Sequence, residues 1–170
     1  NFQKTNVEYI QGDILQLSSL GKKFHVIESV GVLHHLRDPI KGFKELLACL
    51  EPKGLMKIGL YSATARRSIT NYRKLVNKKG IPHNMKTILD FRKEIIEAKK
   101  EDALVITTSL DFYSSSSLRD LIFHTQEVNF KLQEISELLK NFKLTFLGFE
   151  IKEVIKNRFR AQYSDPGDLS

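Results

Sequence analysis

One stretch near the N-terminus constrains the fold more than any other part of the sequence. Phe24 to Val30 is a mostly continuous apolar run, which is typical of a parallel strand covered on both faces. Asp38 and Pro39 then form a helix start, because Asp can cap a helix and Pro fits its first position. A second apolar run follows at residues 55–60. A strand, a helix and a strand at this spacing predict a right-handed crossover unit of a parallel sheet.

Two further strands are predicted, one at residues 7–10, where apolar and polar residues alternate, and one at residues 144–151. Several segments have apolar residues at helical spacing. They are a helix after Asp38, a helix that ends at Gly80, a helix from Asn84 to about Lys100, a short helix after a serine loop at 114–117, and a helix around residues 132–139. The predicted class is therefore α/β. Tyr9, Ile27, Ile58 and Phe146 are expected in strands, and Phe43, Leu47, Ile135 and Leu139 on packed helix faces.

Length and composition fit one domain with a real core, since the chain has 170 residues and is 41% hydrophobic. We find no repeat, no linker that would divide this domain, and no apolar run near the roughly 18 residues that a membrane span needs. The single cysteine, Cys49, is expected to pack in the core, which weakly favours a reducing cytoplasm. The sequence starts without Met or a signal-like layout, so an excised piece of a longer protein is expected.

The net charge is +7, which could indicate a nucleic-acid partner. The lysines are spread along predicted helices, however, and no arginine-rich block or aromatic ladder accompanies them. A solvated charged surface is therefore the favoured interpretation, and nucleic-acid binding the weaker one.

Two short motifs carry the chemistry: Gly12-Asp13-Ile14 after the first predicted strand, and residues 29–36 after the second. Together they resemble class I S-adenosylmethionine-dependent methyltransferases, and residues 24–39 resemble the fourth motif of that family. The resemblance implies S-adenosylmethionine as cofactor. It implies that Asp13 accepts from the adenine amine while the Ile14 N–H meets a ring nitrogen, which matches the donor and acceptor of an adenine edge. It places Ser29, Val30, Gly31 and His34 at the other end of the cofactor, where Gly31 allows close approach of the backbone.

The neighbouring His34 and His35 have three interpretations. They are poor ligands for one shared metal ion, because adjacent side chains diverge on helices and strands, and no metal is predicted. One of them, with His35 the candidate, could act as a general base near neutral pH. The favoured interpretation is that one lines the boundary between cofactor and substrate while the other packs.

Three more residues are candidates for catalysis or substrate binding. Tyr61 follows the strand predicted at residues 55–60, so its hydroxyl could face the same crevice, or it could simply pack at the rim. His124 and Glu127 would project together if their segment were helical, either as an acid/base pair or as a surface ion pair. The segments around Tyr61 and His124 are similar to methyltransferase domains of bacterial proteins that carry tetratricopeptide repeats.

The resemblance also shows what is missing. The family's first strand with its glycine-rich loop and its second strand with the ribose-binding acid are absent from the sequence. We therefore predict a partial Rossmann-like sheet over residues 1–151, followed by a polar tail at 152–170. The 170 residues alone are expected to bind the cofactor weakly and to be inactive. A homodimer, or pairing with the missing N-terminal part, would complete the sheet.

The favoured function is methyl transfer from S-adenosylmethionine to a small molecule or protein by the full-length parent, in the cytoplasm and without a membrane partner. Two alternatives stand beside it. The chain could be a degenerate methyltransferase scaffold that binds a partner protein without catalysis. It could also be an RNA-binding or RNA methyltransferase domain, which the charge of +7 motivates.

Overall fold

The computed structural model describes residues 6–98, 101–124 and 126–163. The chain forms two compact units, although its sequence shows no dividing linker. The first unit comprises the chain up to Leu60 together with His124–Val128, and the second comprises Tyr61–Phe123 and the chain from Asn129 onward. A segment distant in sequence thus returns to the first unit.

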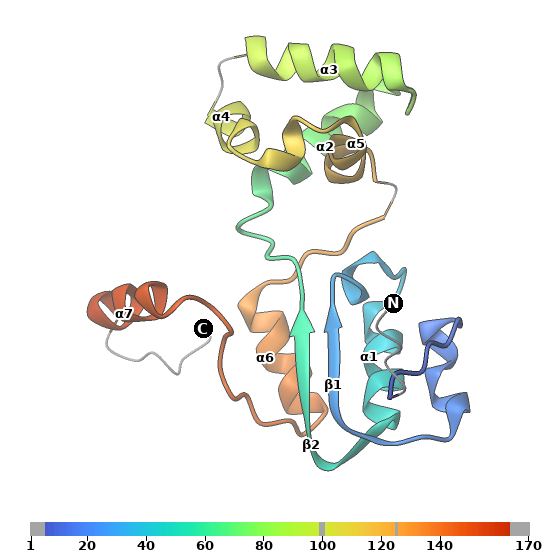
Figure 1. Cartoon of the computed structure of the whole chain (residues 1–170). Helices are drawn as coiled ribbons and strands as arrows, with labels where there is room; N and C mark the ends of the chain where they lie inside the picture. The colour runs from blue at the N-terminus through green and yellow to red at the C-terminus, as the bar shows by residue number, and fades with distance from the viewer. Residues whose placement is uncertain (1–5, 99–100, 125, 164–170) are drawn as a thin grey trace. The chain divides into compact units, whose positions relative to one another are not determined.

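The first unit is built on a two-stranded parallel sheet (Figure 1). Strand β1 is Phe24–Val30 and strand β2 is Leu50–Gly59, and helix α1, Pro39–Ala48, lies between them in sequence. The predicted α/β class and parallel pairing are confirmed, with Ile27 in β1 and Ile58 in β2.

Helix α1 begins where the sequence predicted. The Asp38 carboxylate accepts hydrogen bonds from the backbone N–H groups of Ile40 and Lys41, which are left without helical partners at a helix start. On α1, Phe43 is buried, as predicted, whereas Leu47 is only half-buried.

The start of β2 differs from the prediction. The strand was expected at residues 55–60, but it already begins at Leu50. Phe24 pairs with Leu50 and Val26 with Leu55, so the residues between them form a bulge. Lys53 takes the left-handed φ of 66° there. Residues 51–54 are thus accommodated by a bulge in the hydrogen-bond ladder, and the strand continues through them.

Residues 7–10 do not form the predicted strand. They have no regular structure, and the side chain of Tyr9 is 92% exposed. A strand exists only when a neighbour pairs with its backbone, and within the described residues the sheet consists of β1 and β2 alone. The chain continues into a short 3-10 helix, η1, Ile14–Leu20.

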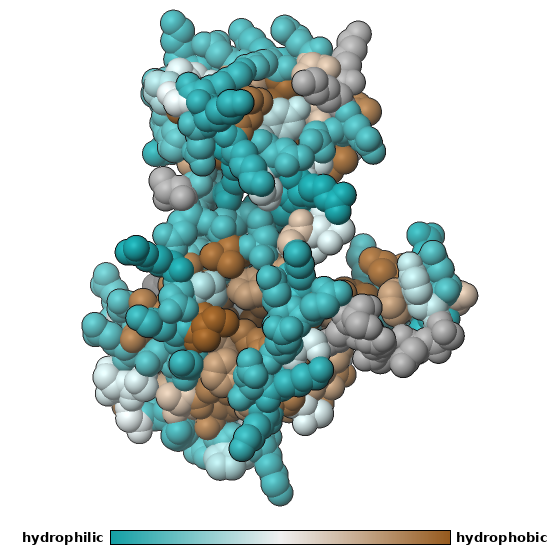
Figure 2. All heavy atoms as spheres, turned by 180° about the vertical axis from the view of Figure 1, so that it is seen from behind, coloured by the Kyte–Doolittle hydropathy of each residue, from teal (hydrophilic) through white to brown (hydrophobic). Residues whose placement is uncertain are grey.

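One face of the sheet is covered and the other is exposed. Ile27 and Ser29 point to the buried face, whereas Val26, Val30 and Leu55 on the opposite face are more than half exposed. Figure 2 shows apolar side chains gathering in the region of the view that holds the sheet. A two-stranded sheet with an exposed apolar face buries less surface than a stable sheet normally does.

The second unit is helical. Its helices are α2 (Arg67–Lys79), α3 (Met85–Glu97), α4 (Glu101–Thr107), α5 (Ser115–Phe123), α6 (Leu132–Asn141) and α7 (Glu153–Gln162), with a 3-10 turn η3 (Leu110–Phe112). Helices α2 to α5 and η3 contact one another around one core (Figure 1). Members of that core include Val76, Ile88, Phe91, Ile95, Ile106, Phe112, Leu118 and Ile122.

Local signals set the ends of these helices as predicted. Gly80 ends α2 in a left-handed conformation, which costs glycine little. The Asn84 side chain accepts from the Thr87 N–H at the start of α3. The predicted serine loop is shorter than expected, because α5 already begins at Ser115. Burial of Leu118 and Ile122 on one face of α5 stabilises this early start.

Residues 144–151 do not form the predicted last strand either. They have no regular structure, Gly148 has a φ of 133°, and Phe146 is partly exposed. As for residues 7–10, the described residues provide no strand to pair with it. The helix predicted around residues 132–139 is confirmed as α6, although Ile135 and Leu139 are only half-buried. Within the segment predicted as a polar tail, the structure forms α7.

Candidate functional site

The end of β1 presents a buried hydroxyl and an open backbone. Ser29 is 5% exposed, and its Oγ has no hydrogen-bond partner among the described residues. Two residues later Gly31 has a φ of 77°, and no atom lies within 4 Å of the position that a Cβ would occupy. Val30 between them is exposed. A buried polar atom without a hydrogen-bond partner is uncommon in a folded protein, because burial without a hydrogen bond is costly.

The two histidines lie in a 3-10 turn, η2, Leu33–His35. Leu33 and His34 are both buried, whereas His35 is half-buried. The backbone N–H of Val128 donates to the His34 carbonyl oxygen at 2.8 Å. The returning segment His124–Val128 is therefore fixed directly to the turn that carries the histidine pair.

This return brings three imidazoles together. The ring centroids of His34 and His35 are 4.3 Å apart, and those of His35 and His124 are 4.5 Å apart. The segment of His124 and Glu127 does not meet the helical condition on which their joint projection depended, because α5 ends at Phe123 and residues 124 and 126–129 have no helical structure. No local pattern predicts the contact of His35 with His124, since the two residues are distant in the chain.

A backbone hydrogen bond fixes the orientation of the His124 ring. The N–H of Gln126 donates to Nδ1 of His124 at 3.1 Å. Because Nδ1 accepts, the neutral imidazole carries its proton on Nε2. The amide of Gln126 also lies 3.5 Å from the His35 carbonyl oxygen, a further link between the returning segment and η2.

Asp13 stands at the start of η1. Its Oδ1 accepts from the N–H of Leu15 at 2.9 Å, and Ile14 begins the turn and is half-buried. Among the described residues no hydrogen bond links Asp13 to residues 29–34.

Contacts between η1 and α1 position this turn. The N–H of Ser18 donates to Oε2 of Glu45 at 2.8 Å. Hydrogen bonds from the Ser18 side chain and backbone hold the pKa of Glu45 below its usual range. The carboxylate is therefore favoured over its protonated form when the unit is folded.

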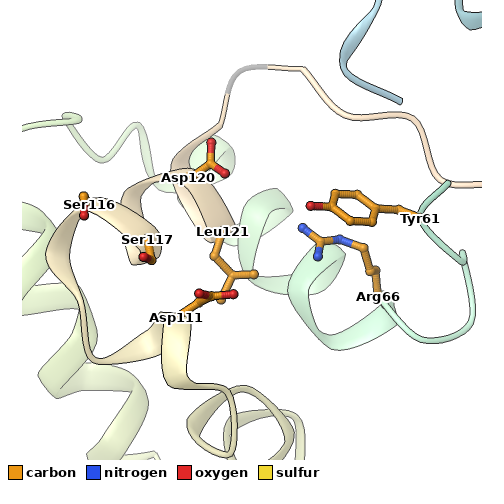
Figure 3. Close-up of a pocket in the computed structure, with 7 residues that line it drawn as sticks. All are labelled: Tyr61, Arg66, Asp111, Ser116, Ser117, Asp120 and Leu121. Atoms are coloured by element: carbon orange, nitrogen blue, oxygen red, sulfur yellow. The ribbon is translucent and has the colours of Figure 1, made fainter. Parts of the chain in front are cut away.

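Tyr61 lies in the second unit, where it lines a pocket of about 320 Å³ (Figure 3). The guanidinium carbon of Arg66 lies 3.7 Å from the centre of the Tyr61 ring, a cation–π arrangement. The other lining residues come from η3 and α5; they are Asp111, Ser116, Ser117, Asp120 and Leu121. The sequence pointed to Tyr61 alone, because helix packing rather than spacing along the chain brings the others together.

The described residues contain neither a metal-ligand cluster nor a membrane-spanning helix. No group of His, Cys, Asp and Glu there is arranged to hold a metal ion. No helix in that part of the chain is both long and apolar enough to cross a membrane.

In a comparison with known protein families, the matching residues lie within the first unit. Residues 1–58 match a family described as "Methyltransferase domain". The match includes η1, β1, η2, α1 and nearly all of β2. It therefore contains both motifs identified in the sequence and leaves the second unit outside.

Two proteins illustrate the wider similarity. An uncharacterized protein of Synechococcus sp. is 23% identical over 161 residues, which is 86% of this chain and 37% of that protein. The tRNA U34 carboxymethyltransferase of Campylobacter curvus is 41% identical over 54 residues, which is 32% of this chain and 18% of that protein. The chain thus spans well under half the length of either relative.

Proposed function

We propose that the whole protein containing this sequence transfers a methyl group from S-adenosylmethionine to an acceptor. The observation that carries the proposal is the methyltransferase-domain match over residues 1–58. This segment includes Asp13 and the Gly31 turn. It also forms a strand, a helix and a second parallel strand, which position the residues at the strand ends. In sheets of this kind, ligands bind beyond the carboxyl ends of the strands.

The residues at the end of β1 fit such a cofactor. The unpartnered Ser29 hydroxyl offers a hydrogen bond, and the open space at Gly31 leaves room for a ligand against the backbone. We propose that Ser29, Val30, Gly31 and His34 hold the methionine end of the cofactor, and that Asp13 and Ile14 hold its adenine. The cofactor would supply an electrophilic methyl group, so the protein needs mainly to align the acceptor with it.

Four residues remain candidates for roles in catalysis: His35, His124, Glu127 and Tyr61. The Nδ1 atom of His124 accepts a hydrogen bond from the Gln126 N–H. That nitrogen is therefore not available as a base. This favours His35 as the proton acceptor of the pair and His124 as the group that orients it.

The acceptor is proposed to be a small molecule or a protein group, and the location cytoplasmic. The similarity to domains of tetratricopeptide-repeat proteins stays a prediction, as do the boundary at residue 151, the absence of the family's first two strands, and a homodimer or pairing with a further segment. An RNA substrate is a second candidate, because one relative is named as a tRNA-modifying enzyme. RNA binding would weaken steeply with salt, whereas binding of a small acceptor would not.

Titration of the whole protein with S-adenosylmethionine tests the proposal. Asp13→Ala should weaken cofactor binding by about 1–3 kcal/mol, because the adenine amine loses its acceptor. Asp38→Ala is the matched control, because Asp38 also caps a helical turn in the same unit. It should lower stability by about 1 kcal/mol and leave the affinity unchanged. The 170 residues alone are expected to bind weakly.

Equal affinity of the Asp13→Ala variant and the unchanged protein, with both folded by circular dichroism, would contradict the adenine assignment. Absence of any cofactor binding by the folded whole protein would remove the methyltransferase proposal altogether. The better account would then be a scaffold that binds a partner protein.

A further inference from the structure

The pocket in the second unit has a chemical character that points to a class of ligand. Its volume of about 320 Å³ is at the small end of the range of about 300–1,000 Å³ for ligand pockets. A pocket of this size takes one side chain or a small metabolite, and is too small for a folded nucleic acid. Its walls come from three segments: the chain after β2, the turn η3 and the helix α5.

Core packing holds the walls in place. Phe112 is fully buried and anchors η3, so the neighbouring Asp111 lies at the surface of the core. The Ser109 hydroxyl accepts from the Asp111 N–H and caps the same turn. On α5, burial of Leu118 and Ile122 turns the opposite side of the helix toward the pocket.

A second set of contacts fixes the far end of α5. Arg73 of α2 donates from its guanidinium to the carbonyl oxygens of Leu121 and Asp120, at 3.0 and 3.2 Å. These bonds satisfy carbonyls near the end of the helix. The pocket is thus built on rigid elements, which is what a selective site requires.

The charges of the pocket favour a cation. One arginine faces two aspartates, Asp111 and Asp120, in a chain whose overall charge is +7. The Arg66 cation already lies against the Tyr61 ring, and Figure 3 shows the two carboxylates on either side of Leu121. The start of α5 contributes a partial positive charge of only about half a unit, which does not offset the second carboxylate.

Asp111 is the group that remains available. Its carboxylate forms no ion pair or hydrogen bond with the described part of the chain. Ser117 and Ser116 provide hydroxyl groups in the same pocket, and Leu121 provides an apolar surface. A charged acceptor, hydroxyl groups and an apolar wall are the complement of an ammonium group on a short aliphatic chain.

We propose that this pocket binds the ammonium group of a small amine or of an amine-bearing side chain, with Asp111 as its counter-ion. Binding of the amine does not depend on the proposed methyl transfer. Only the further step, that this amine is the class of substrate, rests on that proposed function. A protonated ammonium has no lone pair, so the group held at Asp111 is an anchor and a different atom of the substrate accepts the methyl group.

Three probes of equal chain length test the proposal on the 170-residue chain without cofactor: butylamine, butanol and butyrate. Ligand-observed NMR titration should show binding of butylamine at millimolar concentration, weaker binding of butanol and none of butyrate. Asp111→Asn should weaken butylamine binding about five-fold, the upper range for a partly exposed ion pair. Asp90→Asn, an exposed aspartate on α3 that removes the same charge, should leave it unchanged.

Equal losses in the Asp111→Asn and Asp90→Asn variants would overturn the proposal, because the effect would then reflect net charge alone. Stronger binding of butyrate than of butylamine would also overturn it and favour an anion site at Arg66. Because no cofactor is present, failure here leaves the methyltransferase proposal standing. Amine binding by a protein that binds no cofactor would instead refute methyl transfer and keep the pocket.

Discussion

The two units of this chain differ in how they pair their backbone hydrogen-bonding groups and in how completely they bury their apolar side chains. The helical core of α2 to α5 closes on itself, with Phe112 and Leu118 fully buried. The first unit rests on two strands, and Val26 and Val30 on one face of its sheet remain more than half exposed. Helices satisfy their hydrogen bonds internally, whereas a sheet depends on neighbouring strands.

The difference separates two kinds of function. The unit with the two-stranded sheet is the one that matches a methyltransferase domain, and it holds the cofactor candidates from Asp13 to His34. The helical unit lies outside that match and holds the pocket around Asp111. Under the two proposals above, the candidate cofactor site belongs to the first unit and the candidate amine pocket to the second.

The same truncation in each unit gives the largest expected contrast. Phe112→Ala should lower the free energy of unfolding by about 3–5 kcal/mol, because it leaves a cavity in a closed core. Phe24→Ala in β1 should cost less than about 2 kcal/mol, because that ring is already 39% exposed. Denaturant titration, with amide hydrogen exchange to assign each loss to its unit, measures both. Equal costs would break the comparison.

A smaller effect concerns how each unit responds to acid. Asp102 of α4 accepts hydrogen bonds from the Asn71 amide and the Ser68 hydroxyl of α2, which hold its pKa below the usual range. Glu45 plays the same part between α1 and η1 in the first unit. A lowered pKa stabilises the folded state above the usual pKa of the group, and this contribution is lost as the pH falls through the lowered value.

Thermal unfolding at several pH values tests this pair. Asp102→Asn should be less stable than the unchanged chain at pH 7, and the gap should narrow below about pH 4, where carboxylates begin to protonate. Glu45→Gln should behave alike in the first unit. If the difference in stability between variant and unchanged chain did not vary with pH, the charge of these carboxylates would not contribute to stability.

Local signals were sufficient for much of the fold. Asp38, Gly80 and Asn84 marked helix ends correctly, because a cap depends only on neighbouring residues. The sequence patterns at residues 7–10 and 144–151 failed as strand signals, because pairing depends on a partner that the pattern does not contain. The bulge at Lys53 likewise reflects register with β1 rather than local sequence.

The candidate sites divide in the same way. Gly31 has a φ of 77°, a conformation that glycine adopts most easily, while its contact with the cofactor stays a prediction. The contact of His124 with His35 and the meeting of Asp111 with Arg66 were not predictable, because tertiary packing creates both. Spacing along the chain carries no record of such contacts.

The central claim is that the turn after β1 holds the cofactor, and two glycines allow a direct test. Gly31 and Gly21 belong to the same unit, have φ values of 77° and 61°, and have open space at the Cβ position. Valine at either site therefore imposes similar backbone strain. Isothermal titration of the whole protein with S-adenosylmethionine should show binding lost in Gly31→Val and kept in Gly21→Val. Equal affinity in the two folded variants would contradict the account.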